Sequence, residues 1–497
     1  MITLRHPNDI TLDTVEAVAY RGESLTIHPT LLETVRRTHE AMRSALANGE
    51  RVYSINTGVG FLVTKDLSES EQMRHQRNLL VGRAVGSPPF LPPEEARAVL
   101  VARLVNFLSG YAGVTPELCQ FVVDRLNDGF TPAIPRTGIG SSGEVIPLSH
   151  AFQTFFGIGS VVDADGRVQD AASALAKRGV APYKPAPKEG ISLLAGAPGA
   201  VAISTARRRA AVTLSRQVLF SAACAIHAAR APLTVYGEHV GRLANDEVLS
   251  GVLWRLRSLS GGSEPGRPVL QAPVSFRVTP QVLTHVERTV SRFTNDIERA
   301  LGAVSDSPAF VNGRFVSTGG FHEVELAAGM DTCGSALIRA AELSAQRIHR
   351  LLDSRFSGLP DQLTSAPGPQ AGLILVHKRV VGVVNELRRL SLPASLGLAD
   401  TSLGQEDAMT FAFEAAEKLR RVEGLVRDVT ACELLVARQA WALRDEQMPE
   451  GLREVAQPIV DAVDPVNEDR PLGPDLTRLI KMLERGEFAN KIKVGGR

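Results

Sequence analysis

The residues with the most specific chemical potential lie between positions 132 and 150, which read PAIPRTGIGSSGEVIPLSH. Glycine opens backbone geometries closed to other residues and proline fixes φ, so this segment is predicted to be a tight, stiff loop. In such a loop the amide nitrogen of Gly143 can reach the carbonyl carbon of Ser141 and close a five-membered ring. Dehydration, including loss of the Ser142 hydroxyl, then leaves a methylidene beside a carbonyl, which is a strong electrophile. The alternative for a bare Ser-Ser-Gly is an ordinary turn, and the surrounding residues decide between the two.

Those surroundings, TGIGSSGEVIPLSH, resemble the signature GSxGASGDLxPLxH of the histidine, phenylalanine and tyrosine ammonia-lyases. In that family the Ala-Ser-Gly becomes 4-methylideneimidazole-5-one (MIO), so the resemblance implies an MIO formed from Ser141, Ser142 and Gly143. Ser141 stands for the usual alanine, whose side chain is not consumed by ring closure. Glu144 stands for the usual aspartate and adds one methylene next to the ring. His150, at the end of the signature, is interpreted as structural rather than catalytic.

A second motif contains one of only five tyrosines in the chain. Residues 51–60, RVYSINTGVG, resemble the family's Y-G-x-N/T-T-G-F-G, in which the tyrosine acts as the base. The resemblance therefore assigns that role to Tyr53, and the alternative is a half-buried packing tyrosine. A phenol has a reference pKa of about 10, so its site must lower that pKa for it to act as a base near neutral pH.

The pocket for the substrate side chain is predicted from the end of a helix. Residues 71–86 have a helical pattern with a glycine stop, and the family reads the substrate at the positions of Gly82 and Arg83. Histidine lyases carry a polar pair there, and phenylalanine lyases carry Phe-Leu. A permanent cation at Arg83 disfavours a plain phenyl pocket, because burying an unpaired charge is costly. Alternatively, Arg83 points to solvent or pairs with a structural carboxylate.

A second polar element of that pocket lies at residues 403–407, LGQED, which resemble the Asn-Gln-Glu-Asp of histidine lyases. The resemblance places Gln405 and Glu406 at the substrate, with Glu406 paired to Arg83. A lone Gln-Glu-Asp is more often the charge pattern of a helix start.

Two further positions follow from later motifs. QAPVSFRVTPQV, residues 271–282, resembles the family's QDPYSLRCxPQV, in which the arginine, here Arg277, binds the substrate carboxylate with its guanidinium fork. The alternative for Arg277 is a surface salt bridge. STGGFHEVELAAGMD, residues 317–331, resembles SGGNFHGxPVAxxxD, and Phe321 is expected to line the pocket near the electrophile.

The chain also departs from the family at four polar positions. Ala195, Gly320 and Gly404 replace asparagines, and Val274 replaces a second active-site tyrosine. An alanine offers no side-chain donor or acceptor, so each change removes a polar partner. Asn106 is retained as the expected polar anchor of its helix, either in the site or as an interior hydrogen bond.

The elements that position these residues are predicted to be mainly helical. Helical patterns cover residues 30–48, about 200–260, a long stretch after Asp331 and roughly 407–444. The run 261–266 is predicted to be a flexible loop. The resemblance implies an ammonia-lyase-like fold with a central bundle of long helices. The expected organisation is a loop-rich N-terminal region carrying the active site (1–200), the bundle (201–450) and a polar C-terminal tail (451–497).

The totals agree with a helical enzyme acting on a small molecule. The chain has 497 residues, 44% hydrophobic and 22% charged, with a net charge of +1, which argues against a nucleic-acid or membrane surface role. Four scattered cysteines are expected to be buried thiols, and neither metal spacing nor a signal or membrane segment is found. We therefore expect a cytoplasmic protein, and the resemblance implies a homotetramer with an amino-acid substrate.

Three functional hypotheses remain open. The first is an MIO-dependent carbon–nitrogen lyase that eliminates ammonia from an aromatic or polar, histidine-like or non-standard α-amino acid. The second keeps the fold but changes the reaction, to an aminomutase or an MIO-independent elimination on an unusual substrate. The third is a catalytically inactive scaffold paralogue. Retention of Tyr53, Arg277 and the Ser-Gly pair argues against the third.

Overall fold

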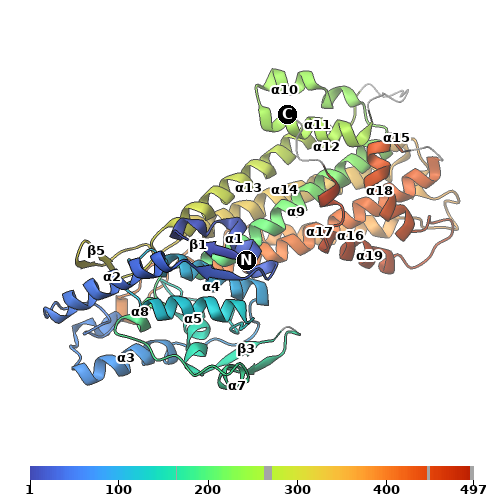
Figure 1. Ribbon diagram of the computed structural model, residues 1–497. Helices are drawn as coiled ribbons and strands as arrows, with labels where there is room; N and C mark the ends of the chain where they lie inside the picture. Colours follow the sequence, from blue (N-terminus) through green and yellow to red (C-terminus); the bar gives the residue numbers. More distant parts are fainter. Residues whose placement is uncertain (164, 262–270, 445–447, 493–497) are drawn as a thin grey trace. The chain divides into compact units, whose positions relative to one another are not determined.

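A computed structural model describes residues 1–163, 165–261, 271–444 and 448–492. The predicted loop at 261–266 lies, apart from Gly261, outside the described residues. The chain, whose helices and strands are drawn in Figure 1, forms two compact units that interleave along the sequence. The first unit contains residues 1–207, 294–330 and 394–417, and the second contains 208–293, 331–393 and 418–497.

The first unit holds the N-terminal helices. These are α1 (Leu12–Tyr20), α2 (Pro29–Ala47), α3 (Glu69–Val81), α4 (Pro93–Leu108), α5 (Pro116–Asn127), α6 (Val145–Gln153), α7 (Ala171–Lys177) and α8 (Glu189–Leu194). The predicted helix at 30–48 is confirmed as α2. The helix predicted at 71–86 is confirmed as α3, which begins with a capping box between Ser68 and Glu71 and ends at Gly82.

The centre of the first unit is α4. Proline in its first turn suits a helix start, where the backbone N–H needs no partner. From Leu100 to Leu108 every residue is buried, so this helix is enclosed on all sides rather than lying on a surface. Helix α1 packs on α4, and α3 packs on α8.

Short strand pairs and single turns of 3-10 helix complete the first unit. The strands β1 (Ile2–Leu4) and β2 (Leu25–Ile27) are parallel, with Ile2 opposite Leu25. The pairs β3 (Ser160–Val162) with β4 (Val168–Asp170), and β5 (Ala309–Val311) with β6 (Arg314–Val316), are antiparallel. Two 3-10 turns matter for the site, η2 (Gly60–Thr64) and η6 (Ser402–Gly404).

Four long helices have residues in both units: α9 (Pro198–Ala228), α13 (Thr279–Gly302), α14 (Val324–Leu351) and α17 (Ala412–Arg444). Within the second unit their side chains join in one buried network. Arg347 of α14 donates through Nε to Glu433 of α17 at 2.7 Å and through Nη1 to Thr279 of α13 at 3.0 Å. Ser221 of α9 donates to the same glutamate at 2.7 Å. The predicted bundle of long helices is confirmed.

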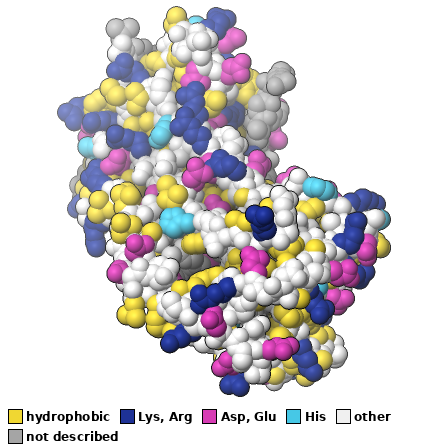
Figure 2. All heavy atoms as spheres, turned by 90° about the vertical axis from the view of Figure 1, so that its left-hand side faces the viewer, with side chains coloured by type: hydrophobic (Ala, Val, Ile, Leu, Met, Phe, Trp, Pro, Cys, Tyr) yellow, Lys and Arg dark blue, Asp and Glu magenta, His cyan; other side chains and the backbone are white. Residues whose placement is uncertain are grey.

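The shorter helices of the second unit are α10 (Glu238–Ala244), α11 (Glu247–Ser260), α12 (Val274–Arg277), α15 (Ser354–Ser357), α16 (Ile374–Arg389), α18 (Glu450–Ala462) and α19 (Gly473–Glu484). All four cysteines are buried free thiols, as predicted. In the described ranges no helix combines the length and the apolarity needed to cross a membrane. On the face shown in Figure 2, basic and acidic side chains are interspersed with apolar ones.

Candidate active site

The Ser141–Ser142–Gly143 triplet lies in a bend directly before α6, in the first unit. Gly138 holds a left-handed φ of +74°, a geometry that glycine adopts without strain. The hydroxyl of Ser141 donates to the carbonyl oxygen of Gly143. The hydroxyl of Ser142 is buried and, among the described residues, has no hydrogen-bond partner. Buried hydroxyl groups normally have a hydrogen-bond partner. Because the Ser142 hydroxyl has none among the described residues, its loss as water would break no hydrogen bond there. The triplet therefore fits the prosthetic group that the sequence predicts.

Phe321 packs on this triplet. A β-carbon added at Gly143 would lie 3.6 Å from Cδ2 of Phe321, which is van der Waals contact. The aromatic ring thus covers the last residue of the triplet.

Glu144, the residue after the triplet, has a clear structural task. Its carboxyl oxygens accept the backbone N–H groups of Gly199 and Ala200, at 2.6 and 2.5 Å, in the first turn of α9. These two donors have no partner within the helix, so Glu144 satisfies them. Its side chain is buried, and this burial raises its pKa to about 8 although the two hydrogen bonds and Arg103 act in the opposite direction.

Tyr53 lies in the loop before η2. Its hydroxyl accepts the backbone N–H of Gly60 at 2.9 Å. Burial raises the pKa of Tyr53, the Gly60 hydrogen bond lowers it, the charge of Glu406 raises it and that of Arg83 lowers it. The net direction is upward, whereas a base working near neutral pH needs a lowered pKa. In the single chain, Tyr53 therefore lacks the lowered pKa that a base working near neutral pH requires.

The structure places Tyr53, Arg83 and Glu406 close enough for the charge of each to shift the pKa of another. Arg83 is half-buried just after α3 and donates from Nη1 to the carbonyl of Leu79 at 3.1 Å. Burial lowers the pKa of Arg83, while Tyr53 and Glu406 raise it. In the described part of the chain Arg83 and Glu406 form no direct ion pair, although a pairing was expected.

The other pocket positions border this group. Gly82 is the C-cap of α3, immediately before Arg83. Gln405 and Glu406 belong to the turn of η6, which is closed by the hydrogen bond from Thr401 N to Glu406 O at 2.8 Å. The turns η2 and η6 pack together, so the loop after Tyr53 and the loop of Glu406 are neighbours.

His150 and Asn106 hold loops in place. His150 Nε2 accepts the backbone N–H of Gly86 at 2.9 Å, which confirms a structural contact for this residue. Asn106 Oδ1 accepts from the backbone N–H and the hydroxyl of Ser305, at 3.0 and 2.9 Å.

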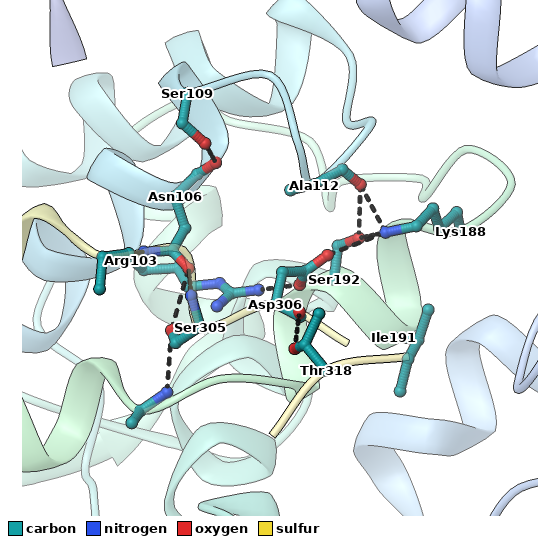
Figure 3. A network of polar contacts seen from close by, with 12 residues as sticks. Arg103, Asn106, Ser109, Ala112, Lys188, Ile191, Ser192, Ser305, Asp306 and Thr318 are labelled. Atoms are coloured by element: carbon teal, nitrogen blue, oxygen red, sulfur yellow. Dashed lines mark hydrogen bonds and ion pairs between the residues drawn. The ribbon is translucent and has the colours of Figure 1, made fainter. Parts of the chain in front are cut away.

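A buried charge network supports these loops, and sequence reasoning missed it. Asp306 accepts from Arg103 Nη2 at 3.0 Å and from Lys188 Nζ at 2.9 Å, and all three side chains are buried (Figure 3). Lys188 also donates to the carbonyl of Ala112 at 2.6 Å and holds a left-handed φ of +74°. Asp306 lies 118 residues from Lys188 and 203 residues from Arg103 in the sequence, so nothing in local sequence indicates the pairing.

Arg277 belongs to the second unit, at the end of α12. Its Nε is buried and lacks a hydrogen-bond partner in the ranges that the structure describes. Val274, which stands for the family's second tyrosine, is 57% exposed. The role of Arg277 at the substrate carboxylate stays a prediction.

Comparison with known proteins decides the family. The sequence profile described as "Aromatic amino acid lyase" matches residues 10–463. The chain belongs to the aromatic amino acid lyase family. It is 32% identical to a histidine ammonia-lyase of Streptomyces coelicolor, over 96% of each chain.

Solved structures of other enzymes share the fold of this chain. The tyrosine aminomutase of Streptomyces globisporus superposes with a TM-score of 0.89 at 26% identity, covering 97% of each chain. The ergothioneine-degrading ergothionase of Treponema denticola superposes with a TM-score of 0.94, covering 99% of this chain and 100% of the other. Its sequence identity is 23%, so that similarity concerns the fold alone.

Proposed function

We propose that this lyase-family protein is an MIO-dependent ammonia-lyase, acting on an α-amino acid with an aromatic or polar, histidine-like or non-standard side chain. The observation that carries the proposal is the triplet itself. Within a family match over residues 10–463, Ser142 presents a buried hydroxyl for which the described residues provide no partner, and Phe321 packs on Gly143. The ring that the triplet would form supplies an electrophile for the amino-group end of the substrate.

In this proposal the chain's own residues bind the substrate and move its proton. Arg277 binds the carboxylate as a bidentate donor. Tyr53 removes the β-proton, and its hydroxyl is already oriented by the N–H of Gly60. That N–H favours the phenolate, because hydrogen bonding to a charged form stabilises it. Arg83 favours the phenolate as well, and Glu406 opposes it.

The side-chain pocket supports a polar substrate. The charge of Glu406 raises the pKa of Arg83, although the two side chains form no direct ion pair among the described contacts. A ligand group placed there meets a donor on one side and an acceptor on the other. We therefore expect a side chain that both accepts and donates a hydrogen bond, with Gly82 leaving space, Gln405 adding a polar group and Phe321 bounding the pocket.

A second candidate keeps the fold and changes the reaction. The family's motifs carry polar residues at the positions of Ala195, Val274, Gly320 and Gly404, and their absence here supports an altered reaction, an aminomutase or an elimination that needs no MIO. A homotetramer and a cytoplasmic location, without nucleic-acid or membrane partners, complete the primary proposal. The inactive paralogue is the third possibility that the test below addresses.

The test is the mass of the peptide containing Thr137 to His150, taken from the natively folded protein. We expect it to be lighter than the encoded sequence by two waters. A panel of amino acids, beginning with histidine and polar aromatic analogues, should then yield ultraviolet-absorbing products and free ammonia. An isomerised amino acid in place of ammonia identifies an aminomutase. An unmodified peptide removes the MIO mechanism and leaves only the MIO-independent or inactive alternatives.

A further inference from the structure

Glu323 is a carboxylate that the family's motif does not contain, because a glycine stands at its position in SGGNFHG. It directly precedes α14 and lies two residues after Phe321, whose ring packs on Gly143. Its side chain lines a cavity of about 10 Å³, together with Ala102, Asn106, Ala197, Pro198, Val201, Ala300, Leu301 and Ser305. A polar cavity of this size is about that needed for one water molecule.

Glu323 and Glu144 approach the same helix end. Pro198 and Val201, in the first turn of α9, line the cavity of Glu323. Gly199 and Ala200, in the same turn, donate their N–H groups to Glu144. The positive end of a helix dipole lies here, and it favours negative charge.

The charge of Glu323 acts on the carboxyl group of Glu144. For Glu144, burial raises the pKa to about 8, the N–H groups of Ala200 and Gly199 lower it, Glu323 raises it and Arg103 lowers it. For Glu323, burial raises the pKa, Glu325 raises it and Arg299 lowers it. Burial and the negative charge of Glu323 both disfavour the ionised form of Glu144, so at neutral pH Glu144 mainly keeps its proton.

The cavity also lies where the chain has lost two amides. A β-carbon on Gly196, next to Ala195, would meet Ser305 Oγ at 2.7 Å, and one on Gly320 would meet Ser305 Cα at 3.1 Å. The loops of both former asparagines therefore contact Ser305, which lines the cavity of Glu323. Glu323 therefore lines a cavity beside the two loops in which the family's motifs carry asparagines.

We propose that Glu144 and Glu323 act as a carboxyl pair that transfers protons during ring closure of the Ser141–Ser142–Gly143 triplet. Glu144 adjoins the triplet, and Glu323 is the positioning residue that exchanges its proton with the cavity. A bond forms between Gly143 N and Ser141 C. The Ser141 carbonyl oxygen leaves as water with the amide hydrogens of Ser142 and Gly143. The Ser142 hydroxyl leaves as water with the Ser142 Cα hydrogen, so the sequence is balanced without an oxidant.

The inference rests on the proposed MIO and is tested without a substrate. Freshly synthesised full-length protein is incubated between about pH 6.5 and 9, and the triplet peptide is weighed at timed intervals. Since one pKa unit changes a protonated fraction about tenfold, Glu323→Gln should slow ring closure by up to about tenfold at the alkaline end. Removing a negative neighbour lowers the pKa of Glu144, so the alkaline decline should begin at lower pH.

Matched variants separate this role from a merely structural one. Glu40→Gln, at an exposed glutamate of α2 that acts on the pKa of neither Glu144 nor Glu323, should leave both the rate and its pH dependence unchanged. Glu323→Asp keeps the charge and should restore most of the rate. Glu144→Gln is unsuitable as the main variant, because it disturbs the first turn of α9. If the wild-type triplet stays unmodified, the proposed function and this inference both fall. If wild type and Glu323→Gln close the ring at equal rates and pH profiles, only this inference falls.

Discussion

At the scale of single residues, the site is defined by opposing charges around one phenol. Tyr53 receives a hydrogen bond from Gly60 and senses Arg83 and Glu406. Tyr53, Arg83 and Glu406 were predicted from sequence motifs, and the structure places them where their charges act on one another. The sequence did not indicate the direction of the pKa shift, which depends on burial and on loops far apart in the chain.

The balance of charges gives two predictions of opposite sign. Glu406→Gln removes a negative charge, so the pKa of Tyr53 falls and the rise of kcat/KM with pH moves to lower pH. Arg83→Gln removes a positive charge and moves that rise to higher pH. The measurement is the pH profile with a substrate found in the amino-acid panel. Exposed neighbours provide the controls, Asp407→Asn and Arg77→Gln, which should leave the profile in place. Shifts in the same direction for both site variants would contradict the assignment.

At the scale of elements, the loops around the site depend on the buried Asp306. Replacing it by asparagine leaves Arg103 and Lys188 as uncompensated buried charges. Breaking a buried pair in this way typically costs about 3–5 kcal/mol, so Asp306→Asn should lower the free energy of unfolding by about that amount. Denaturant unfolding measures it. Glu23→Gln, which removes an exposed partner of Arg21, serves as the control and should unfold like wild type. Equal stability of both variants would show that the buried network is not needed.

Gly320 and Gly404, where the family's motifs carry asparagines, differ in whether the structure has room for an asparagine side chain. A β-carbon at Gly320 would lie 2.7 Å from the carbonyl oxygen of Val304, so Gly320→Asn should lower the melting temperature by several degrees. Gly404 has nothing within 4 Å of such a carbon and a left-handed φ of +83°, which asparagine tolerates. Gly404→Asn should therefore melt close to wild type in a thermal scan. The reverse order would mean that the loop at Val304 adjusts freely.

These elements also show the limits of prediction from sequence. Helices such as α2 and α3 follow from local periodicity, caps and a terminal glycine. The charge network of Asp306 and the contact between Phe321 and Gly143 join segments separated by more than a hundred residues. Such contacts are decided by packing, and only a family motif can indicate them in advance. Glu323 escaped notice because it interrupts a motif rather than matching it.

At the scale of the whole molecule, a short segment of the first unit exposes large apolar side chains. Leu396 is 73% exposed and Leu398 is 81% exposed. Large apolar side chains that are exposed close together along the chain are typical of a surface that another chain covers. We expect a native mass of four chains by light scattering, and a smaller species for the double variant Leu396→Lys, Leu398→Lys. Val168→Lys, at a position 54% exposed on β4, is the control and should keep the wild-type mass. A monomeric wild type would contradict this expectation.

The four buried thiols allow local unfolding to be measured by cysteine labelling, because a reagent reaches them only when the fold opens. Burial raises the pKa of Cys119, Cys224 and Cys432, so these thiols are kept from reagents both by access and by protonation while the chain is folded. Cys119 belongs to the first unit, and the others, with Cys333, belong to the second. Labelling therefore times the opening of each unit separately. Equal rates at Cys119 and Cys432 mean that the molecule opens as one cooperative body, and unequal rates reveal which half gives way first.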